Sequence, residues 1–260
     1  MSITISLRVS DGIVLVADSL ATVRAVPIPQ EEFVKCPECL GKIPYSRIIA
    51  PPSTMFAVSQ TVNKLFCLLG RFGVLSYGTS FITKRTIQSH ILEFERNLPE
   101  NCTVEEIAKK LEVYMRRELT VEVIDLEQIK EGEYPLSFQV AGYDEDDMET
   151  PKTWTLNIGK TSLIEPVHEG GYSCTFGGDG RIIQRLWQDD PQNPIPLPNY
   201  QLLSLQDAIE YAVFLVRTTI DAQKFIPMPP TCGGDIDVAI ITPTDGFVWI
   251  RKKELDVYSI

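Results

Sequence analysis

Short apolar runs separated by turn residues predict strands at both ends and in the middle of the chain. Two such runs, Ile3 to Val9 and Ile13 to Ala17, flank the turn Ser10-Asp11-Gly12. Apolar runs on either side of an Asp-Gly pair are typical of a β-hairpin. Further strands are expected at 55–58, 64–69, 72–77, 134–143, 153–158, 162–167, 172–176, 235–242 and 246–250.

Helical periodicity occupies the intervals between these strands. One helix is expected at about 81–97 and a second at about 103–119, where Thr103-Val-Glu-Glu106 forms a capping-box pattern. A short helix follows Gly180, and Ser204 caps a long helix that reaches about Gln223. The inward faces carry Ile87, Ile91 and Phe94; then Ile107, Leu111, Tyr114 and Met115; then Leu205, Ile209, Ala212, Val213, Val216 and Ile220.

The order of these elements is strands, two helices, strands, two helices and strands. Blocks of this kind favour an α+β layered fold over an alternating parallel sheet. The order runs through the middle of the chain without a linker, so we expect a single domain over 1–260. Residues 23–58 are rich in proline and lack clear periodicity. They are expected to form an irregular surface excursion with one short strand.

Composition excludes several classes of partner. The 260 residues are 44% hydrophobic, and their net charge of −11 opposes binding to nucleic acid or to an anionic membrane. The sequence shows neither a signal-peptide pattern at its start nor an apolar run long enough to cross a bilayer. We therefore expect a cytoplasmic protein. Four of the six cysteines, Cys67, Cys102, Cys174 and Cys232, lie apart and are expected to be reduced thiols.

The remaining two cysteines, Cys36 and Cys39, form a Cys-Pro-Glu-Cys tetrad within the 23–58 segment. This is half of a structural zinc set, which takes four ligands. The chain has no second such pair, and its only histidines are His90 and His168. A zinc site shared between subunits, a redox pair and a plain loop with two thiols all fit the pattern. We expect the plain loop, and no metal or other cofactor.

The start of the chain carries the candidate chemistry. Ser2 follows only the initiator Met1, and a small second residue generally permits removal of that methionine. Ser2 would then carry a hydroxyl and a free α-amine, which titrates at about pH 7.7–8. A serine hydroxyl needs a base to become nucleophilic, and this amine can be that base. One residue can therefore supply both groups.

With these features the chain resembles the proteasome β-type subunits of the N-terminal nucleophile (Ntn) hydrolase superfamily. Members begin with a catalytic threonine, a strand, an Asp-Gly turn and a strand ending Ala-Asp-Ser-x-Ala-Thr. Residues Ser2 to Thr22 match this pattern without a gap: Asp11-Gly12 fall on the turn, and Ala17-Asp18-Ser19 with Ala21-Thr22 fall on the strand end.

A second stretch, Ser59 to Gly78, is similar to the family segment that begins near its catalytic lysine and ends in a glycine. Gly142 and the run Cys232-Gly-Gly234 also fit. The 23–58 segment is then an insertion about 30 residues longer than the usual connection. The resemblance covers nearly the whole chain and implies a four-layer αββα sandwich.

The resemblance also implies a role for each matched residue. Ser2 would attack an acyl carbon while its own amine moves the proton. Lys64 would lower the pKa of that hydroxyl, and Asp18 would keep Lys64 charged and oriented. The backbone N–H at Gly78 would stabilise the oxyanion, an effect of roughly 3–4 kcal/mol for one donor. Taken singly, Asp18 and Lys64 would be ordinary solvated side chains, and Gly78 a turn glycine.

Several positions depart from the family pattern. Ser2 stands where the family favours threonine. Asp179 takes the place of a serine between two glycines, where it is most simply a turn residue or a helix cap. In the family's Asp-x-x-Ser-Gly-Gly segment the serine falls on Cys232, and the aspartate falls on Pro229 or is displaced to Asp221.

The resemblance implies a self-assembling peptidase with Ser2 as nucleophile, acting on peptides or unfolded proteins. A homo-oligomeric ring and an ATP-dependent unfoldase as partner follow from the same resemblance. An amidase acting on small molecules on the same fold is a close variant. The alternative from another class is a non-catalytic structural subunit of such a ring, which the departures at Asp179 and Cys232 favour.

Overall fold

The computed structural model describes residues 2–24, 32–35, 42–45, 55–82, 84–121, 126–167, 171–188, 196–227 and 229–253. The fold is mixed α+β, and every described strand pair is antiparallel. One sheet has the order β14-β1-β2-β15-β16. Its strands are β1 (Ile3–Val9), β2 (Gly12–Ala17), β14 (Ser173–Gly178), β15 (Asp237–Thr242) and β16 (Gly246–Arg251).

The other large sheet has the order β13-β12-β11-β8-β7. Its strands are β7 (Leu65–Leu68), β8 (Phe72–Gly78), β11 (Leu136–Asp144), β12 (Asp147–Ile158) and β13 (Leu163–Pro166). Within the described ranges, four helices accompany the sheets: α1 (Ile87–Glu95), α2 (Val104–Val121), α3 (Arg181–Trp187) and α4 (Leu205–Gln223). The 3₁₀ turns η1 (Leu126–Gln128) and η2 (Tyr200–Leu202) lie in the connections.

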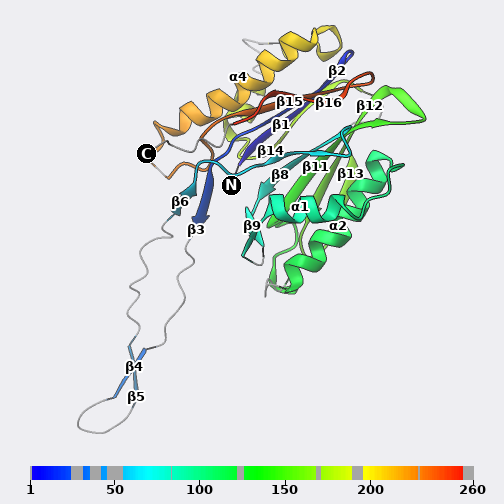
Figure 1. Ribbon diagram of the computed structural model, residues 1–260. Coiled ribbons are helices and arrows are strands. Elements are labelled where there is room, and N and C mark those ends of the chain that lie inside the picture. Colours follow the sequence, from blue (N-terminus) through cyan, green and yellow to red (C-terminus); the bar gives the residue numbers. More distant parts are fainter. Residues whose placement is uncertain are drawn as a thin grey trace, which may run out of the picture.

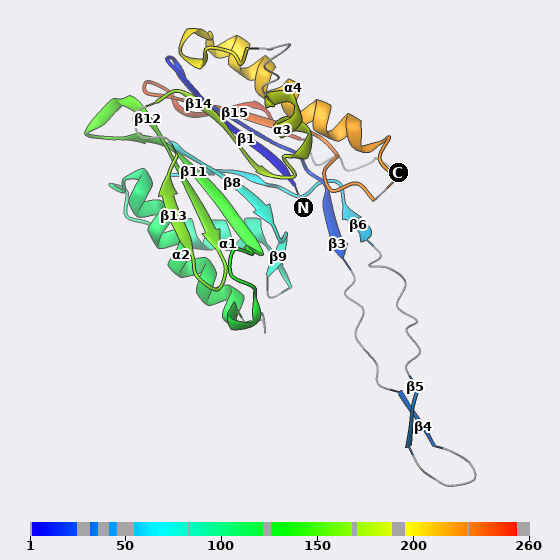
Figure 2. The ribbon, with the colours of Figure 1, turned by 180° about the vertical axis from the view of Figure 1, so that it is seen from behind.

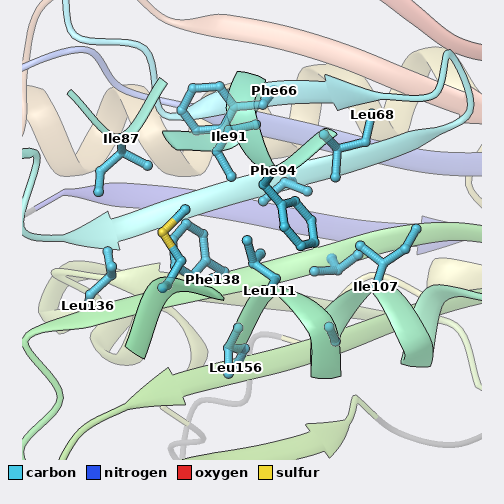
Figure 3. Close-up of a cluster of buried hydrophobic side chains, with 14 of the residues drawn as sticks. Phe66, Leu68, Ile87, Ile91, Phe94, Ile107, Leu111, Leu136, Phe138 and Leu156 are labelled. Carbon is cyan, nitrogen blue, oxygen red and sulfur yellow. The ribbon is translucent and has the colours of Figure 1, made fainter. Parts of the chain in front are cut away.

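The helices divide between the two sheets. Helix α4 contacts β1 and β2 and packs beside α3, whereas α2 contacts β11 and β12 and packs beside α1 (Figures 1 and 2). Figure 3 shows the apolar cluster between α1, α2 and their sheet, with Ile91, Phe94 and Leu111 facing Phe138 of β11. A second cluster lies between α4 and the other sheet, where Ile3 and Ile5 of β1 take part.

The two sheets also meet each other. Ile13 and Leu15 of β2 pack with Leu75 of β8 and Ala141 of β11 in a third apolar cluster. Side chains on a strand alternate between its two faces, and both faces of β1 and β2 are covered. Every residue of these two strands is accordingly buried, so the first hairpin lies deep in the fold.

Most predicted helix starts are found. Thr103 and Glu106 exchange the two hydrogen bonds of a capping box: Thr103 N donates to Glu106 Oε2 (3.1 Å) and Glu106 N donates to Thr103 Oγ1 (3.2 Å). Ser204 caps α4 by accepting from Asp207 N at 3.1 Å. These signals are local, so the sequence predicts them well.

The prediction of a helix at 81–97 is wrong at its start. Strands β9 (Phe81–Ile82) and β10 (Arg85–Thr86) instead form a small antiparallel hairpin there. Lys84 in its turn has a φ of +62°, which an α-helix does not allow. Thr86 then caps α1 by accepting from Ser89 N at 3.3 Å. The cap residue therefore decides where the helix begins.

The 23–58 segment contains more regular structure than predicted. Strand β3 (Ala21–Arg24) pairs with β6 (Met55–Ser59), the one strand expected there, and β4 (Glu32–Lys35) pairs with β5 (Lys42–Tyr45). Figures 1 and 2 show the β4–β5 pair apart from the two large sheets. Cys36 and Cys39 lie outside the described residues.

Among the helices of the described ranges, none is both long enough and apolar enough to cross a bilayer.

Candidate active site

Asp18 and Lys64 form a buried ion pair. Asp18 directly follows β2, and Lys64 directly precedes β7. The Lys64 Nζ lies 2.7 Å from Asp18 Oδ1, and the two side chains are 2% and 0% exposed. Neither residue is therefore an ordinary solvated side chain. The same Nζ donates to the carbonyl of Leu20 at 2.6 Å. Charges are tolerated inside a protein when they are paired and hydrogen-bonded in this way.

Backbone amides from three segments hold the Asp18 carboxylate. Oδ1 accepts from Ile3 N at 2.9 Å, and Oδ2 accepts from Gly233 N at 2.9 Å and from Leu20 N at 3.3 Å. The start of β1, the turn after β2 and the loop before β15 therefore meet at one carboxylate. Hydrogen bonds to an ionised acceptor are stronger than neutral ones and fix its orientation.

Ser2 is 1% exposed at the start of β1. Its chain neighbour Ile3 donates to Asp18, and its own carbonyl accepts from Asp179 N at 2.7 Å. The backbone of the candidate nucleophile is thus held from two sides. Met1, whose removal the proposed chemistry requires, lies outside the described residues.

Gly78 ends β8. Ser76, two residues earlier in the same strand, donates from its N–H to the carbonyl of Lys64 at 2.8 Å. Gly78 itself has a φ of +103°, and a Cβ there would lie 2.4 Å from the carbonyl oxygen of Pro135. This position therefore requires glycine for the turn alone. Its role as an oxyanion donor stays a prediction.

Asp179 lies beside Ser2 and carries a charge. Arg181 donates to its carboxylate from Nε at 2.8 Å and from Nη2 at 2.7 Å. This guanidinium is the main reason that the pKa of Asp179 is lowered to about 2. The preceding Gly178 has a φ of +88°, and a Cβ on it would lie 1.9 Å from the Ser2 carbonyl oxygen. The close approach of the two backbones therefore requires glycine.

Cys232 is also close to this centre. Its thiol is 1% exposed, and burial together with the nearby charges of Asp18 and Asp179 raises its pKa. The thiol is therefore neutral near pH 7 and is a poor nucleophile. Two positions were considered above for the aspartate of the family segment, and neither is buried in this centre as Cys232 is. Pro229 is exposed, and Asp221 is half exposed and paired with Lys224.

Metal ligation finds no support in the part of the chain that the structure describes, where no three His, Cys, Asp or Glu side chains are grouped to hold an ion. Cys36, Cys39 and His168 lie outside that part. Cys67, Cys102, Cys174 and Cys232 form no disulfide among the described residues; Cys67 is half-buried and the other three are buried.

Sequence analysis did not identify three contributors to this centre: the carbonyl of Leu20, the amide of Gly233 and the close approach of Gly178 to Ser2. Two are backbone groups, which every residue possesses, so no residue type marks them. Gly178 and Gly233 stand out in the sequence as glycines, which often mark a close backbone approach. A glycine alone does not say which other segment it approaches.

Comparisons with known proteins bear on the fold. The sequence matches no protein-family model and no curated protein. Solved structures do match, among them a Gly-1 mutant of Anbu from Hyphomicrobium sp. strain MC1. The TM-score is 0.54 at 13% identity, and the match covers 99% of this chain and 88% of that chain. At this identity the likeness shows that this chain shares a fold with Anbu.

Proposed function

We propose that the protein is a proteasome-like Ntn hydrolase that cleaves amide bonds, with Ser2 as its nucleophile after removal of Met1. Its substrates are peptides or unfolded proteins. The chain is one domain over 1–260 with an insertion at 23–58, and its sheets and helices form the four-layer αββα sandwich of that superfamily. The shared fold with Anbu supports this architecture.

The buried Asp18–Lys64 pair is the observation that carries the proposal. A lysine ammonium has three N–H donors. Within the described part of the chain, Asp18 and Leu20 accept two of them. In the proposed site the third donor serves the Ser2 hydroxyl; the support is that Ile3, the residue next to Ser2, donates to the same carboxylate. Three backbone segments converge on this pair beside the start of β1, and this convergence distinguishes it as a candidate site.

The proposed reaction uses one proton carrier. The Ser2 α-amine takes the hydroxyl proton as Oγ bonds to the carbonyl carbon of the substrate. The oxyanion that forms accepts from the N–H of Gly78. The C–N bond then breaks, and the leaving nitrogen takes the proton from the α-ammonium. Water attacks the resulting ester with the same amine as base, which releases the acid and restores Ser2.

Lys64 would contribute electrostatically to this reaction. A positive charge near the Ser2 hydroxyl and α-amine favours their deprotonated forms and lowers both pKa values. Asp18 would keep that ammonium charged and aimed, since its carboxylate is itself held by three backbone amides. Burial strengthens the effect, because the local dielectric is low.

The same centre would also serve an amidase acting on small molecules, and a non-catalytic ring subunit is the candidate from another class. The latter is favoured by the neutral thiol of Cys232 and the charged Asp179, which replace family hydroxyls beside Ser2. A homo-oligomeric ring, and an ATP-dependent unfoldase that feeds it, belong to the proposal in either case.

The deciding experiment is the intact mass of the protein expressed in its native cytoplasm, with and without an epoxyketone inhibitor. That warhead captures a hydroxyl and a free α-amine on one residue. We expect loss of Met1 and a one-to-one adduct, which Ser2→Ala abolishes. Ser6→Ala is the matched control, because Ser6 is a buried serine of β1, the strand that directly follows Ser2. Retention of Met1 would overturn the mechanism and favour the structural subunit.

A further inference from the structure

A second group of buried polar side chains lies next to the Asp18–Lys64 pair. Asp179 precedes α3, Gln223 is the last residue of α4, and Thr231 belongs to the loop before β15. Their exposed fractions are 7%, 6% and 4%. Three polar side chains from three elements, each more than nine-tenths buried, form a costly arrangement unless every group is satisfied.

These three side chains satisfy one another. The Thr231 hydroxyl donates to Asp179 Oδ2 at 2.6 Å, and Gln223 Nε2 donates to the same oxygen at 3.0 Å. Gln223 Nε2 also lies 2.8 Å from Thr231 Oγ1. The amide of Thr231 donates back to Gln223 Oε1 at 2.6 Å. A fully connected network of this kind is rigid and holds the loop that contains Thr231.

The held loop reaches the ion pair two residues later. The amide of Gly233 donates to Asp18 Oδ2 at 2.9 Å, and its carbonyl accepts from Ser19 N at 3.0 Å and Leu20 N at 2.9 Å. Leu20 in turn accepts from Lys64. On its other side the network touches the candidate nucleophile, since Asp179 N donates to the Ser2 carbonyl.

We propose that Thr231, with Asp179 and Gln223, is a positioning unit for the Asp18–Lys64 centre. Its hydrogen bonds fix the Thr231–Gly234 loop so that the Gly233 amide sets the Asp18 carboxylate and, through it, the Lys64 ammonium. The effect on hydrolysis rests on the proposed function; the effect on Asp18 does not. None of the three touches the reacting atoms, so they are positioning residues.

A purely structural role makes a different prediction. If the network only anchors the C-terminal end of α4, its loss lowers global stability and leaves the Gly233 amide as protected as other core amides. If it positions the loop, the Gly233 amide opens locally, more often than the rest of the protein.

Native-state hydrogen exchange of the Gly233 amide separates the two roles. Thr231→Val keeps the shape of the side chain and removes its hydroxyl, whereas Thr231→Ser keeps the hydroxyl. The matched control is Thr219→Val, a buried threonine of α4 whose hydroxyl donates to Leu215 O. Exchange is measured on the full chain relative to the amide of Val14 in β2, which reports global opening.

We expect Thr231→Val to raise the relative exchange rate of Gly233 about tenfold, the factor for one buried hydrogen bond. Thr231→Ser and Thr219→Val leave it near the wild-type value. Equal rates in Thr231→Val and wild type, or the same rise in Thr219→Val, would overturn the proposal. If Thr231→Val does not fold, Gln223→Met tests the same network, because it removes the acceptor of the Thr231 amide and the Nε2 donor to Asp179.

Hydrolysis gives a second readout. Thr231→Val should lower kcat with little change in KM, and Thr231→Ser should restore it, because the unit acts on the centre and not on substrate binding. A wild-type protein without hydrolysis would remove the proposed function, yet the exchange experiment would still decide whether the unit positions Asp18.

Discussion

Two buried ion pairs lie next to each other in this protein, and they are built differently. Asp18–Lys64 is 0% and 2% exposed, and Asp237–Lys253 is 1% exposed at both side chains. Asp237 begins β15 opposite Ala17, the residue before Asp18. By burial and charge alone the two pairs are equivalent.

Their hydrogen bonds distinguish them. Asp18 accepts from three backbone amides in three segments as well as from Lys64. Asp237 accepts from the backbone N–H and from the Nζ of one residue, Lys253. The second pair closes residue 253 onto the sheet, whereas the first gathers the start of β1, a turn and a loop. Convergence of segments, more than burial, marks a candidate site.

The sharpest test of this comparison removes each lysine in turn. We expect Lys64→Met to lower hydrolysis about a thousandfold, the upper range for loss of one preorganised group. Lys253→Met should leave the activity of the folded protein near wild type. Both variants should lose roughly 3–5 kcal/mol of unfolding free energy, because each leaves a buried carboxylate unpaired. Cleavage of a fluorogenic peptide, corrected for the folded fraction, is the measurement.

Equal losses of activity in the two variants at the same folded fraction would mean that the pairs do not differ in function. Assembly is expected to survive in both, and size-exclusion chromatography checks it.

The difference in hydrogen bonding predicts different rescue by a second substitution. Asp237→Leu added to Lys253→Met should return part of the lost stability, because replacing a whole buried pair by apolar side chains is often neutral and one amide, that of Lys253, then lacks its acceptor, at about 1–3 kcal/mol. Asp18→Leu added to Lys64→Met should return less, since it leaves the amides of both Ile3 and Gly233 without their acceptor, at about 1–3 kcal/mol each. Urea unfolding of the four variants measures this, and equal rescue of both pairs would contradict it.

A glycine pair tests how closely Ser2 is held. Gly178→Ala places a Cβ 1.9 Å from the Ser2 carbonyl at a φ of +88°, so we expect a loss of about 2–4 kcal/mol and a drop in activity. Gly70→Ala is the control, because Gly70 has a φ of +69° with nothing within 4 Å of the added carbon. It should cost only about 1 kcal/mol from the backbone conformation.

Thermal or urea unfolding with parallel activity assays distinguishes the two glycine variants. If Gly178→Ala behaves as mildly as Gly70→Ala in both, the approach of Gly178 to Ser2 does not constrain the site.

The smallest expected effect concerns acid. Hydrogen bonds from Arg181 lower the pKa of Asp179 from its ordinary 3.8 to about 2. A carboxylate whose pKa is lowered by folding contributes its stability above the unfolded pKa and loses it as the pH falls through the folded pKa. Wild type should therefore lose stability relative to Asp179→Asn between about pH 4 and pH 2. Urea midpoints at pH 5, 3 and 2 test this; parallel curves would contradict it.

Local signals account for the parts of the fold that sequence analysis predicted well. The first hairpin, the capping box at Thr103 and the cap at Ser204 each depend on residues within a few positions of one another. The start of α1 was missed because Lys84 adopts a positive φ, and nothing in the periodicity of 81–97 indicates that turn. The pairing of β3 with β6 is not predicted, because the residues that pair lie more than 30 positions apart in the sequence.

Apolar periodicity and turn residues predict the strands and helices that carry the site, and the family resemblance supplies the candidates Ser2, Asp18, Lys64 and Gly78. Which backbone groups meet these residues follows from the packing of the folded chain alone. Gly233 donates to Asp18 across 215 residues, and Thr231 reaches Asp179 across 52. The physical reason is that apolar periodicity and caps are local, whereas these contacts follow from how two sheets and α4 pack, and a backbone N–H has no signature in the sequence.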